Sequence, residues 1–456
     1  MSNRERFYCE RDRRTREYGL DGGCFEQPVA ICVGPDAAES ERGQLVVLAL
    51  VNMLCRLHRR LCLSLPDAPL LAPAAVGEVK LRGHASLREA VDVLSRAIDP
   101  FIGLEWRIPS SVTAGIGLGR ITGDGAPWYV GCQAGLVTIA TQPLPVDGEA
   151  GFSLGACLAA CVAASVVLKQ VLGKMVKSLQ LSAWNLEQGE HAELGPSTLA
   201  PVDVGRVLMV GAGGVGSCLA YWLHQSGVVG QWLVVDKDEV ELHNTNRSLG
   251  LLPVDAGWPN GIARPKAEAA AELIGATACR KWFNELDQES LAIDLIMPLA
   301  NEHGIRNSVC QRGEPLLLHA TTSRGWEAQL HRHIAGRDDC IVCRMPPSSR
   351  AVQFACSTVP LGEGSHQSDA ALPFLSATAG LLLVSGLYQL MFEQLGKREH
   401  NWWRVMYNSV HGMMMSGKCR CHADCPGIPS PAVRRVNKGR RWSHLDEVCA
   451  GLGETA

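Results

Sequence analysis

A glycine run in the middle of the chain has the spacing of a nucleotide-binding turn. Gly211, Gly213 and Gly216 follow the pattern G-x-G-x-x-G, and Gly214 lies between them. In such a turn the first glycine permits the bend, the second lets the backbone approach a phosphate, and the third permits close packing of helix on strand. Free N–H groups at the helix start then face the anion. The pattern predicts a nucleotide site.

Polar residues further along the chain indicate which nucleotide this site would bind. Asp236 lies 20 residues after Gly216, where a carboxylate can accept protons from the ribose hydroxyls. Arg247 and Lys266 follow, and a triphosphate under attack needs cations on its β- and γ-phosphates. A nicotinamide oxidoreductase needs no such cations, so the set favours ATP over NAD. For either cation taken alone, a solvated surface residue is the favoured interpretation.

Cysteines near the C-terminus form a metal-type pattern. The run Cys340-Ile341-Val342-Cys343 has the spacing of a zinc knuckle. Four thiolates make a closed tetrahedral Zn²⁺ site. The predicted ligands are two pairs of thiolates: Cys340, Cys343, Cys421 and Cys425. The second pair is one residue wider than usual, so Cys419 and His422 are alternatives for the fourth ligand, and a cluster of unliganded thiols is the alternative to a metal site.

Cys356 stands apart from these pairs. It precedes a polar segment, residues 361–368, which contains Gly362, Gly364 and His366 and is typical of a mobile loop. A thiolate is a strong nucleophile, so a cysteine beside such a segment could have a catalytic role. A buried structural thiol would give the same pattern, and both interpretations stay open.

The elements that must position these residues are those of an α/β fold. Residues 206–210 and 231–236 read as strands on either side of the glycine turn and its helix. The first half begins in the same way, with strands at 29–34 and 61–65 and a helix at 43–57, but lacks the spaced glycines. We therefore predict two doubly wound, Rossmann-like halves, of which the N-terminal one is degenerate.

The predicted organisation has five parts. They are an N-terminal arm at 1–26, a degenerate half at 27–180, a linker at 181–203, an intact half at 204–430 and a tail at 431–456. The charged run Arg11-Asp12-Arg13-Arg14 within the arm reads as solvated surface. Residues 370–392 carry no charge, and we expect a buried helix there rather than a membrane span.

Composition excludes several classes of protein. The 456 residues are 46% hydrophobic and 20% charged, which excludes a wholly disordered chain. With 43 basic and 46 acidic residues the net charge is −3, so we expect no nucleic-acid partner. The N-terminus lacks the apolar stretch of a signal peptide, and most of the 18 cysteines stand singly in apolar runs. We expect a cytoplasmic protein without a membrane anchor.

The sequence after the second strand carries a resemblance to a known family. Asp236-x-Asp238-x-Val240-x-x-x-Asn244-x-x-Arg247, followed by Pro265-Lys266, resembles the signature of the ThiF/MoeB and ubiquitin-activating enzyme superfamily. The likeness runs over roughly residues 203–425. It includes Arg306-Asn307, the Cys340 knuckle and Cys356. The N-terminal half is similar only in outline, to the inactive half of two-part activating enzymes.

This resemblance implies ATP-dependent adenylation of a ubiquitin-like β-grasp protein at its C-terminal glycine. Asp236 would hold the ribose, Asn244, Arg247 and Lys266 would surround the phosphates, and the remaining cofactor-binding positions would be Gly211, Gly213, Gly214, Gly216 and Asp238. Cys356 would take the acyl group as a thioester and pass it to a conjugating partner. The two-half form suits a bacterial antiviral-defence system, and a homodimer is possible in such a family.

One position departs from the family pattern. The family usually has a magnesium-binding aspartate shortly before the residues that match Arg306-Asn307, but this chain has Asn301 there, followed by Glu302. A neutral amide is a poorer ligand for Mg²⁺ than a carboxylate. This departure leaves open a nucleotide-binding scaffold without catalysis. Adenylation for sulfur-carrier or peptide modification without a lasting thioester is a further alternative.

Overall fold

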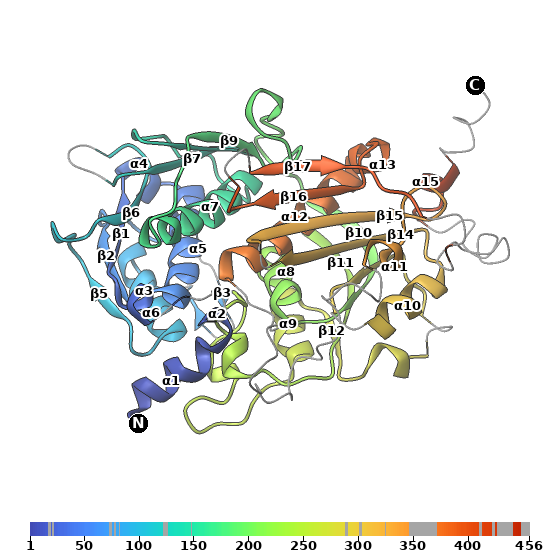
Figure 1. Ribbon diagram of the computed structural model, residues 1–456, viewed down its shortest axis with the longest axis horizontal. Coiled ribbons are helices and arrows are strands. Elements are labelled where there is room, and N and C mark those ends of the chain that lie inside the picture. The colour runs from blue at the N-terminus through green and yellow to red at the C-terminus, as the bar shows by residue number, and fades with distance from the viewer. Residues whose placement is uncertain are drawn as a thin grey trace.

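The computed structural model describes most of the chain in two mixed α/β sheets joined by a layer of helices (Figure 1). The described residues are 1–16, 20, 22–72, 75–76, 79–81, 83–121, 126–146, 148–287, 291–300, 303–323, 325–345, 372–409, 413–421, 425 and 441–447. Both sheets begin with parallel strands and end with antiparallel ones. The predicted fold of two Rossmann-like halves is confirmed.

The N-terminal half contains a seven-stranded sheet in the order β5-β2-β1-β6-β7-β8-β9. Its strands are β1 (Val29–Val33), β2 (Arg60–Ser64), β5 (Gly103–Glu105), β6 (Ala114–Leu118), β7 (Tyr129–Gln133), β8 (Leu136–Ala140) and β9 (Leu179–Ser182), with β3 (Ala75–Val76) and β4 (Val79–Lys80) as a separate pair. Its helices are α1 (Asn3–Arg11), α2 (Arg13–Arg16), α3 (Gly22–Glu26), α4 (Pro35–Ala38), α5 (Glu41–Leu57), α6 (Leu87–Ile98), α7 (Leu154–Val171) and η1 (Gly189–His191).

The C-terminal half contains an eight-stranded sheet in the order β12-β11-β10-β13-β14-β15-β16-β17. Its strands are β10 (Val202–Val210), β11 (Val228–Val235), β12 (Thr277–Cys279), β13 (Leu295–Pro298), β14 (Leu316–Ser323), β15 (Glu327–Ile334), β16 (Trp402–Met406) and β17 (Met414–Gly417). Its longer helices are α8 (Gly214–Gln225), α9 (Lys266–Ile274), α10 (His303–Arg312) and α12 (Pro373–Met391). Its short helices are η2 (Leu242–Asn244), η3 (Pro253–Asp255), η4 (Phe283–Glu285), α11 (Ile341–Arg344), α13 (Gln394–Lys397) and α15 (His444–Glu447).

The two sheets repeat one topology. In each half, the first strand lies in the middle of the parallel part of the sheet. Strand β1 pairs with β2 and β6, and β10 pairs with β11 and β13. In each half the sheet then turns antiparallel, from β7 to β8 and from β14 to β15. One long apolar helix follows this turn in both halves, α7 and α12 respectively. The C-terminal sheet has one more strand, β17, at its edge. The C-terminal half also has a helix, α10, between β13 and β14 in the sequence.

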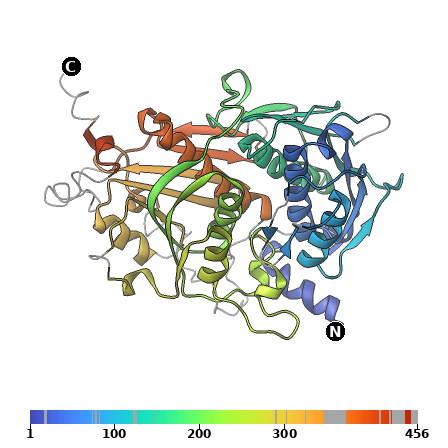
Figure 2. The ribbon, with the colours of Figure 1, turned by 180° about the vertical axis from the view of Figure 1, so that it is seen from behind.

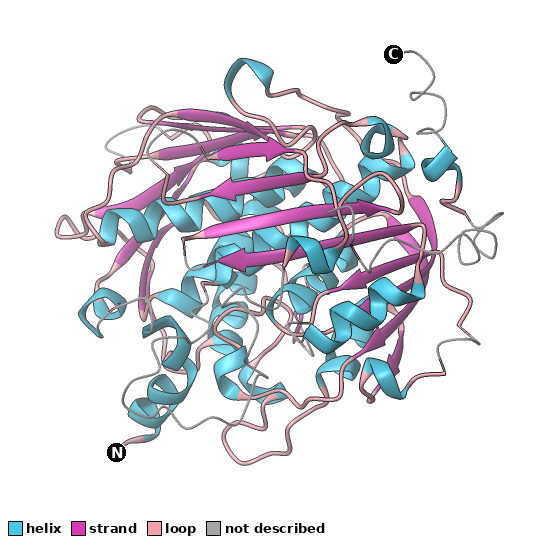
Figure 3. Ribbon diagram, turned by 45° about the vertical axis from the view of Figure 1, so that its right-hand side comes forward, coloured by secondary structure: helices cyan, strands magenta, loops and turns pink. Residues whose placement is uncertain are grey.

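Apolar helices from both halves meet between the sheets (Figures 1 and 2). Helix α12 packs on α8 and on α7, and α5 packs on α7. Of the described helices, α7 and α12 are long and apolar enough to cross a membrane by length and composition, but 89% and 94% of their most apolar windows are buried inside the protein. The uncharged segment at 370–392 thus forms a buried helix in its described part. Figure 3 shows a layer of helices behind the long strands of the sheet in the foreground.

Two residues of the charged run in the arm are buried, which corrects the expectation from sequence for Arg11 and Asp12, whereas Arg13 is exposed as expected and Arg14 is partly exposed. Arg11 and Asp12 are each 1% exposed. The Arg11 guanidinium pairs with the carboxylate of Asp99 at 2.8 Å, and Asp12 pairs with Arg59 at 3.1 Å. These partners lie 47 and 88 residues away along the chain, so the local pattern gives no sign of them. Ser2 and Glu5 form a capping box, which is the one local signal that a helix, α1, starts here.

The segment expected to be a linker, 181–203, is partly built into the fold. It contains the end of β9 and the start of β10. Trp184 and Leu186 are buried, and the hydroxyl of Ser385 in α12 donates to the carbonyl of Ala183. Residues 190–194 are mostly exposed.

Candidate functional site

The glycine turn lies between the end of β10 and the start of α8. Gly211 has φ of 101°, and a Cβ there would lie 2.8 Å from the backbone nitrogen of Ala300. A Cβ on Gly216 would lie 2.2 Å from the carbonyl oxygen of Gly211, so any side chain would push helix from strand. At Gly213, the N-cap of α8, no described atom lies within 4 Å of a Cβ position. The turn therefore presents free backbone N–H groups beside open space.

Asp236 connects this turn to the next loop. One carboxylate oxygen accepts a hydrogen bond from Ala212 N at 2.7 Å, and the other accepts from Asp238 N at 2.9 Å. Burial raises the pKa of Asp236, while the charge of Lys266 and these two hydrogen bonds act in the opposite direction. Each carboxylate oxygen has a second acceptor position left, which is what contact with ribose hydroxyls requires.

Lys266 is the first residue of α9 and reaches back to the same loop. Its Nζ lies 2.9 Å from a carboxylate oxygen of Asp238, and its backbone N–H donates to the Asp238 carbonyl at 2.9 Å. The side chain of Lys266 is only 4% exposed, so its charge is held in place by this pair. The structure therefore brings Asp236, Asp238 and Lys266 into one group at the ends of β10 and β11.

Arg247 completes the group from the other side of the turn. Its Nη1 donates to the His243 carbonyl at 2.8 Å and to Asn246 Oδ1 at 3.2 Å. A Cβ on Gly214 would lie 3.4 Å from the Arg247 Nε, so the side chain rests against the start of α8. Asn244 is 4% exposed, and its side-chain oxygen accepts from Glu241 N within the loop.

Residues of the N-terminal arm reach this site, which the sequence did not indicate. The hydroxyl oxygen of Thr15 accepts from Asn246 Nδ2 at 2.6 Å, and the guanidinium of Arg13 lies 3.2 Å from His243 Nδ1. Burial lowers the pKa of His243 to about 4; the Glu241 carboxylate opposes this shift, and the charges of Arg247 and Arg14 add to it. The arm thus places Arg13 and Arg14 near His243, in the loop that carries Arg247.

The corresponding turn in the N-terminal half is closed to an anion. After β1, Gly34 is followed by Asp36, whose Oδ1 accepts from Arg120 N at 2.7 Å. A Cβ on Gly119 would lie 2.4 Å from the same carboxylate oxygen. Because a carboxylate stands at the turn, a phosphate placed there would be repelled. This gives a physical reason for the degenerate pattern in the first half.

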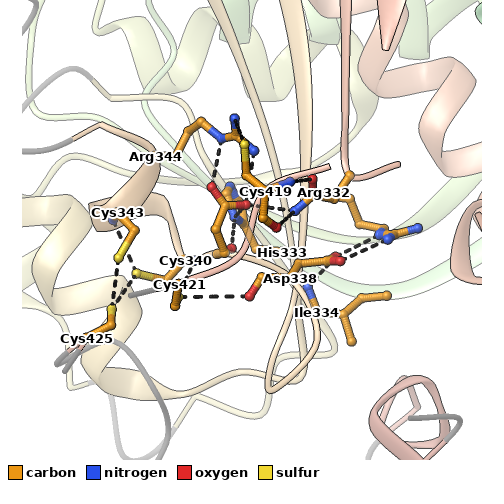
Figure 4. Close-up of polar contacts among 12 residues, drawn as sticks. Arg332, His333, Ile334, Asp338, Cys340, Cys343, Arg344, Cys419, Cys421 and Cys425 are labelled. Carbon is orange, nitrogen blue, oxygen red and sulfur yellow. Dashed lines mark hydrogen bonds and ion pairs between the residues drawn. The ribbon is translucent and has the colours of Figure 1, made fainter. Parts of the chain in front are cut away.

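The predicted metal ligands come together in the C-terminal half (Figure 4). The Sγ atoms of Cys340, Cys343, Cys421 and Cys425 all lie within 4.8 Å of one another. Cys425 Sγ is 3.3 Å from Cys340 Sγ and 3.1 Å from Cys343 Sγ. A tetrahedral site with Zn–S bonds of about 2.3 Å places its sulfurs roughly 3.8 Å apart. Four thiols this close fit a Zn²⁺ ion, and the cluster could hold one.

Cys419 lies beside this cluster, with a different partner. Its Sγ accepts from Arg344 Nη1 at 3.1 Å, and Arg344 is paired with Asp339 at 2.8 Å (Figure 4). Asp339 also accepts from the side chain of Asn401, which bonds the backbone of Cys419. This network holds the segment that follows β17 and carries Cys421.

The predicted positions Asn301, Cys356 and His422 lie outside the described residues, as do Glu302 and the segment 361–368 that we expected to be a mobile loop. The helix that follows Asn301, α10, is described, and its Arg306 is 2% exposed whereas Asn307 is exposed.

The chain matches one family model and a number of solved structures, among them structures of E. coli MccB. The model of the ThiF family matches residues 187–426. No curated protein sequence matches the chain significantly. Crystal structures of E. coli MccB with succinimide and with ATP match at 14% and 15% sequence identity, each with a TM-score of 0.36. Each match covers 49% of this chain and 66% of that chain, just under two thirds of its length.

Proposed function

Because this chain belongs to the ThiF family, we propose that it is an adenylating enzyme that uses ATP to activate the C-terminal carboxylate of a ubiquitin-like protein. The observation that carries the proposal is the grouping of Asp236, Arg247 and Lys266 around the glycine turn. A carboxylate suits the ribose, and the two cations suit the triphosphate.

The chemistry of the first step follows from this arrangement. The substrate carboxylate attacks the α-phosphorus of ATP, the bond to the β-phosphate breaks, and pyrophosphate leaves with the electron pair. Arg247, Lys266 and the N–H groups at the start of α8 stabilise the charge on the phosphates. The guanidinium groups of Arg13 and Arg14 add positive charge from the arm. Bound Mg²⁺ would supply further neutralisation of the phosphates.

We propose a second step at Cys356. Its thiolate attacks the acyl carbon of the adenylate, and AMP leaves, which gives a thioester that passes to a conjugating partner. The two-half form of the chain supports conjugation over sulfur-carrier activation, for which single-half homodimers are usual. A cytoplasmic location, a role in antiviral defence and a possible homodimer belong to the same proposal.

The first experiment measures exchange of labelled pyrophosphate into ATP. The purified chain is mixed with a candidate ubiquitin-like protein that ends in glycine, and with the same protein lacking its last residue. We expect exchange only with the intact C-terminus. Thermal stabilisation by ATP but not by NAD would accompany it, whereas stabilisation by NAD alone would support an oxidoreductase and contradict the proposal.

The second experiment separates thioester transfer from adenylation alone. We expect the wild-type chain to form an adduct with the small protein that thiols cleave, and Cys356→Ala to exchange pyrophosphate without forming it. Pyrophosphate exchange with no adduct in the wild-type chain would favour adenylation of a sulfur carrier or peptide. ATP binding with neither reaction would favour a scaffold.

A further inference from the structure

A buried arginine of the N-terminal half bonds the loop that carries Arg247. Arg56 lies in the last turn of α5 and is 1% exposed. Its Nη1 donates to the carbonyls of Thr245 and, at 3.0 Å, Leu251. Its Nη2 donates to the Leu249 carbonyl at 3.1 Å. The three carbonyls flank Arg247 on both sides, so one guanidinium spans the loop.

Asn52, one turn earlier on α5, completes the contact. Its side-chain oxygen accepts from Arg56 Nε at 2.8 Å, and its Nδ2 donates to the Leu249 carbonyl at 3.2 Å. Asn52 is fully buried. On the other face of the loop, Cys218 Sγ of α8 lies 3.4 Å from the Arg247 carbonyl oxygen. The loop is thus held between a helix of each half.

The charge of Arg56 makes this contact more than ordinary packing. Within the described residues the structure gives Arg56 no ion pair with a carboxylate, and burial lowers its pKa to about 10. A cation buried without a carboxylate is costly unless dipoles replace its hydration. Here the dipoles are the carbonyls of the loop itself, so the loop can lower the energy of the cation only in this conformation.

The conformation of the loop sets the position of Arg247. The Arg247 side chain bonds the His243 carbonyl and rests against Gly214 at the start of α8. A shift of the backbone at residues 245–251 would therefore move its guanidinium away from the turn. We propose that Arg56, together with Asn52, is a positioning residue through which the N-terminal half fixes Arg247 at the phosphate end of the nucleotide site. This inference rests on the proposed function for the site itself.

The test compares the affinities of variants for ATP and for adenosine by calorimetry. Arg247→Ala and Arg56→Gln should each raise the Kd for ATP about 10-fold, because the first removes the cation and the second displaces it, and both should leave the Kd for adenosine unchanged. The double variant should bind ATP no more weakly than Arg247→Ala, because Arg56 acts through Arg247. Arg56→Lys should recover part of the affinity.

Arg42→Gln is the matched control. Arg42 lies on the same helix, is fully buried, pairs with Glu149 and donates to the carbonyls of Ala150, Gly151 and Ser197, none of which belongs to the loop that carries Arg247. Arg42→Gln should leave the Kd for ATP and the Kd for adenosine unchanged. If Arg56→Gln fails to fold, Asn52→Ala replaces it, with a smaller effect of the same kind. Additive losses in the double variant, or equal losses for ATP and adenosine, would overturn the inference.

Hydrogen exchange separates failure of this inference from failure of the proposed function. If the wild-type chain binds no ATP, the proposed function fails, and Arg56 is then judged by the amides of residues 245–251. Faster exchange there in Arg56→Gln, and not in Arg42→Gln, supports the positioning role. Unchanged exchange overturns it.

Discussion

Asp236 and Lys266 meet at one loop, but they face different parts of a nucleotide. Asp236 bonds the backbone of the turn, close to where a ribose would lie, whereas Lys266 extends its charge toward Asp238. Their substitutions should therefore give different losses.

We expect Lys266→Ala to lower the rate of pyrophosphate exchange on the order of 10²-fold, since a cation on the phosphates acts mainly in the transition state. Adenosine affinity should be unchanged. Asp236→Ala should weaken adenosine and ATP alike, and leave the buried N–H of Ala212 without its acceptor. Measurement of exchange rates and of both affinities for the two variants checks this; identical profiles would contradict it.

Buried histidines give the fold a pH dependence. His58 is fully buried, and burial lowers its pKa from 6.5 to about 4. Between these values the unfolded chain binds a proton that the folded chain does not, so stability should fall as the pH is lowered. The contribution of one such group is about 1.4 kcal/mol per pH unit.

The expected result is seen by urea denaturation at pH 7.5, 6.0 and 5.0. Between pH 6.0 and 5.0, the free energy of unfolding of the wild-type chain should fall by about 1.4 kcal/mol more than that of His58→Gln. Parallel pH profiles for the two proteins would show that His58 does not titrate in this way.

At the scale of elements, two substitutions near the cysteine knuckle distinguish a metal ligand from a neighbouring cysteine. Cys421 lies in the cluster of four thiols, while Cys419, two residues earlier, contacts Arg344. We expect about one zinc ion per chain in the wild type and in Cys419→Ser, and loss of zinc with a lower melting temperature in Cys421→Ser, because metal binding adds to folding free energy. Elemental analysis and thermal unfolding measure this. Loss of zinc in Cys419→Ser, with zinc retained in Cys421→Ser, would show that Cys419 and not Cys421 is the metal ligand.

The arm shows how far the sequence predicts the site. Gly211, Gly216 and Asp236 were predictable because turn, helix and strand follow each other within 26 residues. The contacts of Arg13 with His243 and of Arg56 with Leu249 were not, since their partners lie 230 and 193 residues away. A run of charged residues such as 11–14 has no local feature that distinguishes solvated side chains from buried ones. The first strands and the first helix of each half were predictable, because their patterns lie within short stretches of sequence.

In the molecule as a whole, the two halves share one apolar layer. Helices α5 and α7 from the first half and α8 and α12 from the second are almost fully buried where they meet. Neither half can cover this layer alone, so the degenerate half is a structural requirement for the intact one.

We expect residues 193–456 expressed alone to aggregate, because α12 and α8 would expose their apolar faces to water. Co-expression with residues 1–192 should give a soluble complex of the two fragments, since the break falls in the exposed segment 190–194. Size-exclusion chromatography with light scattering measures both. A soluble, monomeric 193–456 fragment would show that the layer does not bind the halves together.

The placement of α7 has a consequence for synthesis on the ribosome. It is complete at residue 171, but α12, against which it packs, ends at residue 391. At roughly 5–20 residues per second, the nascent chain carries the uncovered face of α7 for roughly 10–40 s. During this interval the apolar face has no native partner in the second half. An exposed apolar face of this kind is a site for aggregation or for chaperone binding until translation reaches its partner.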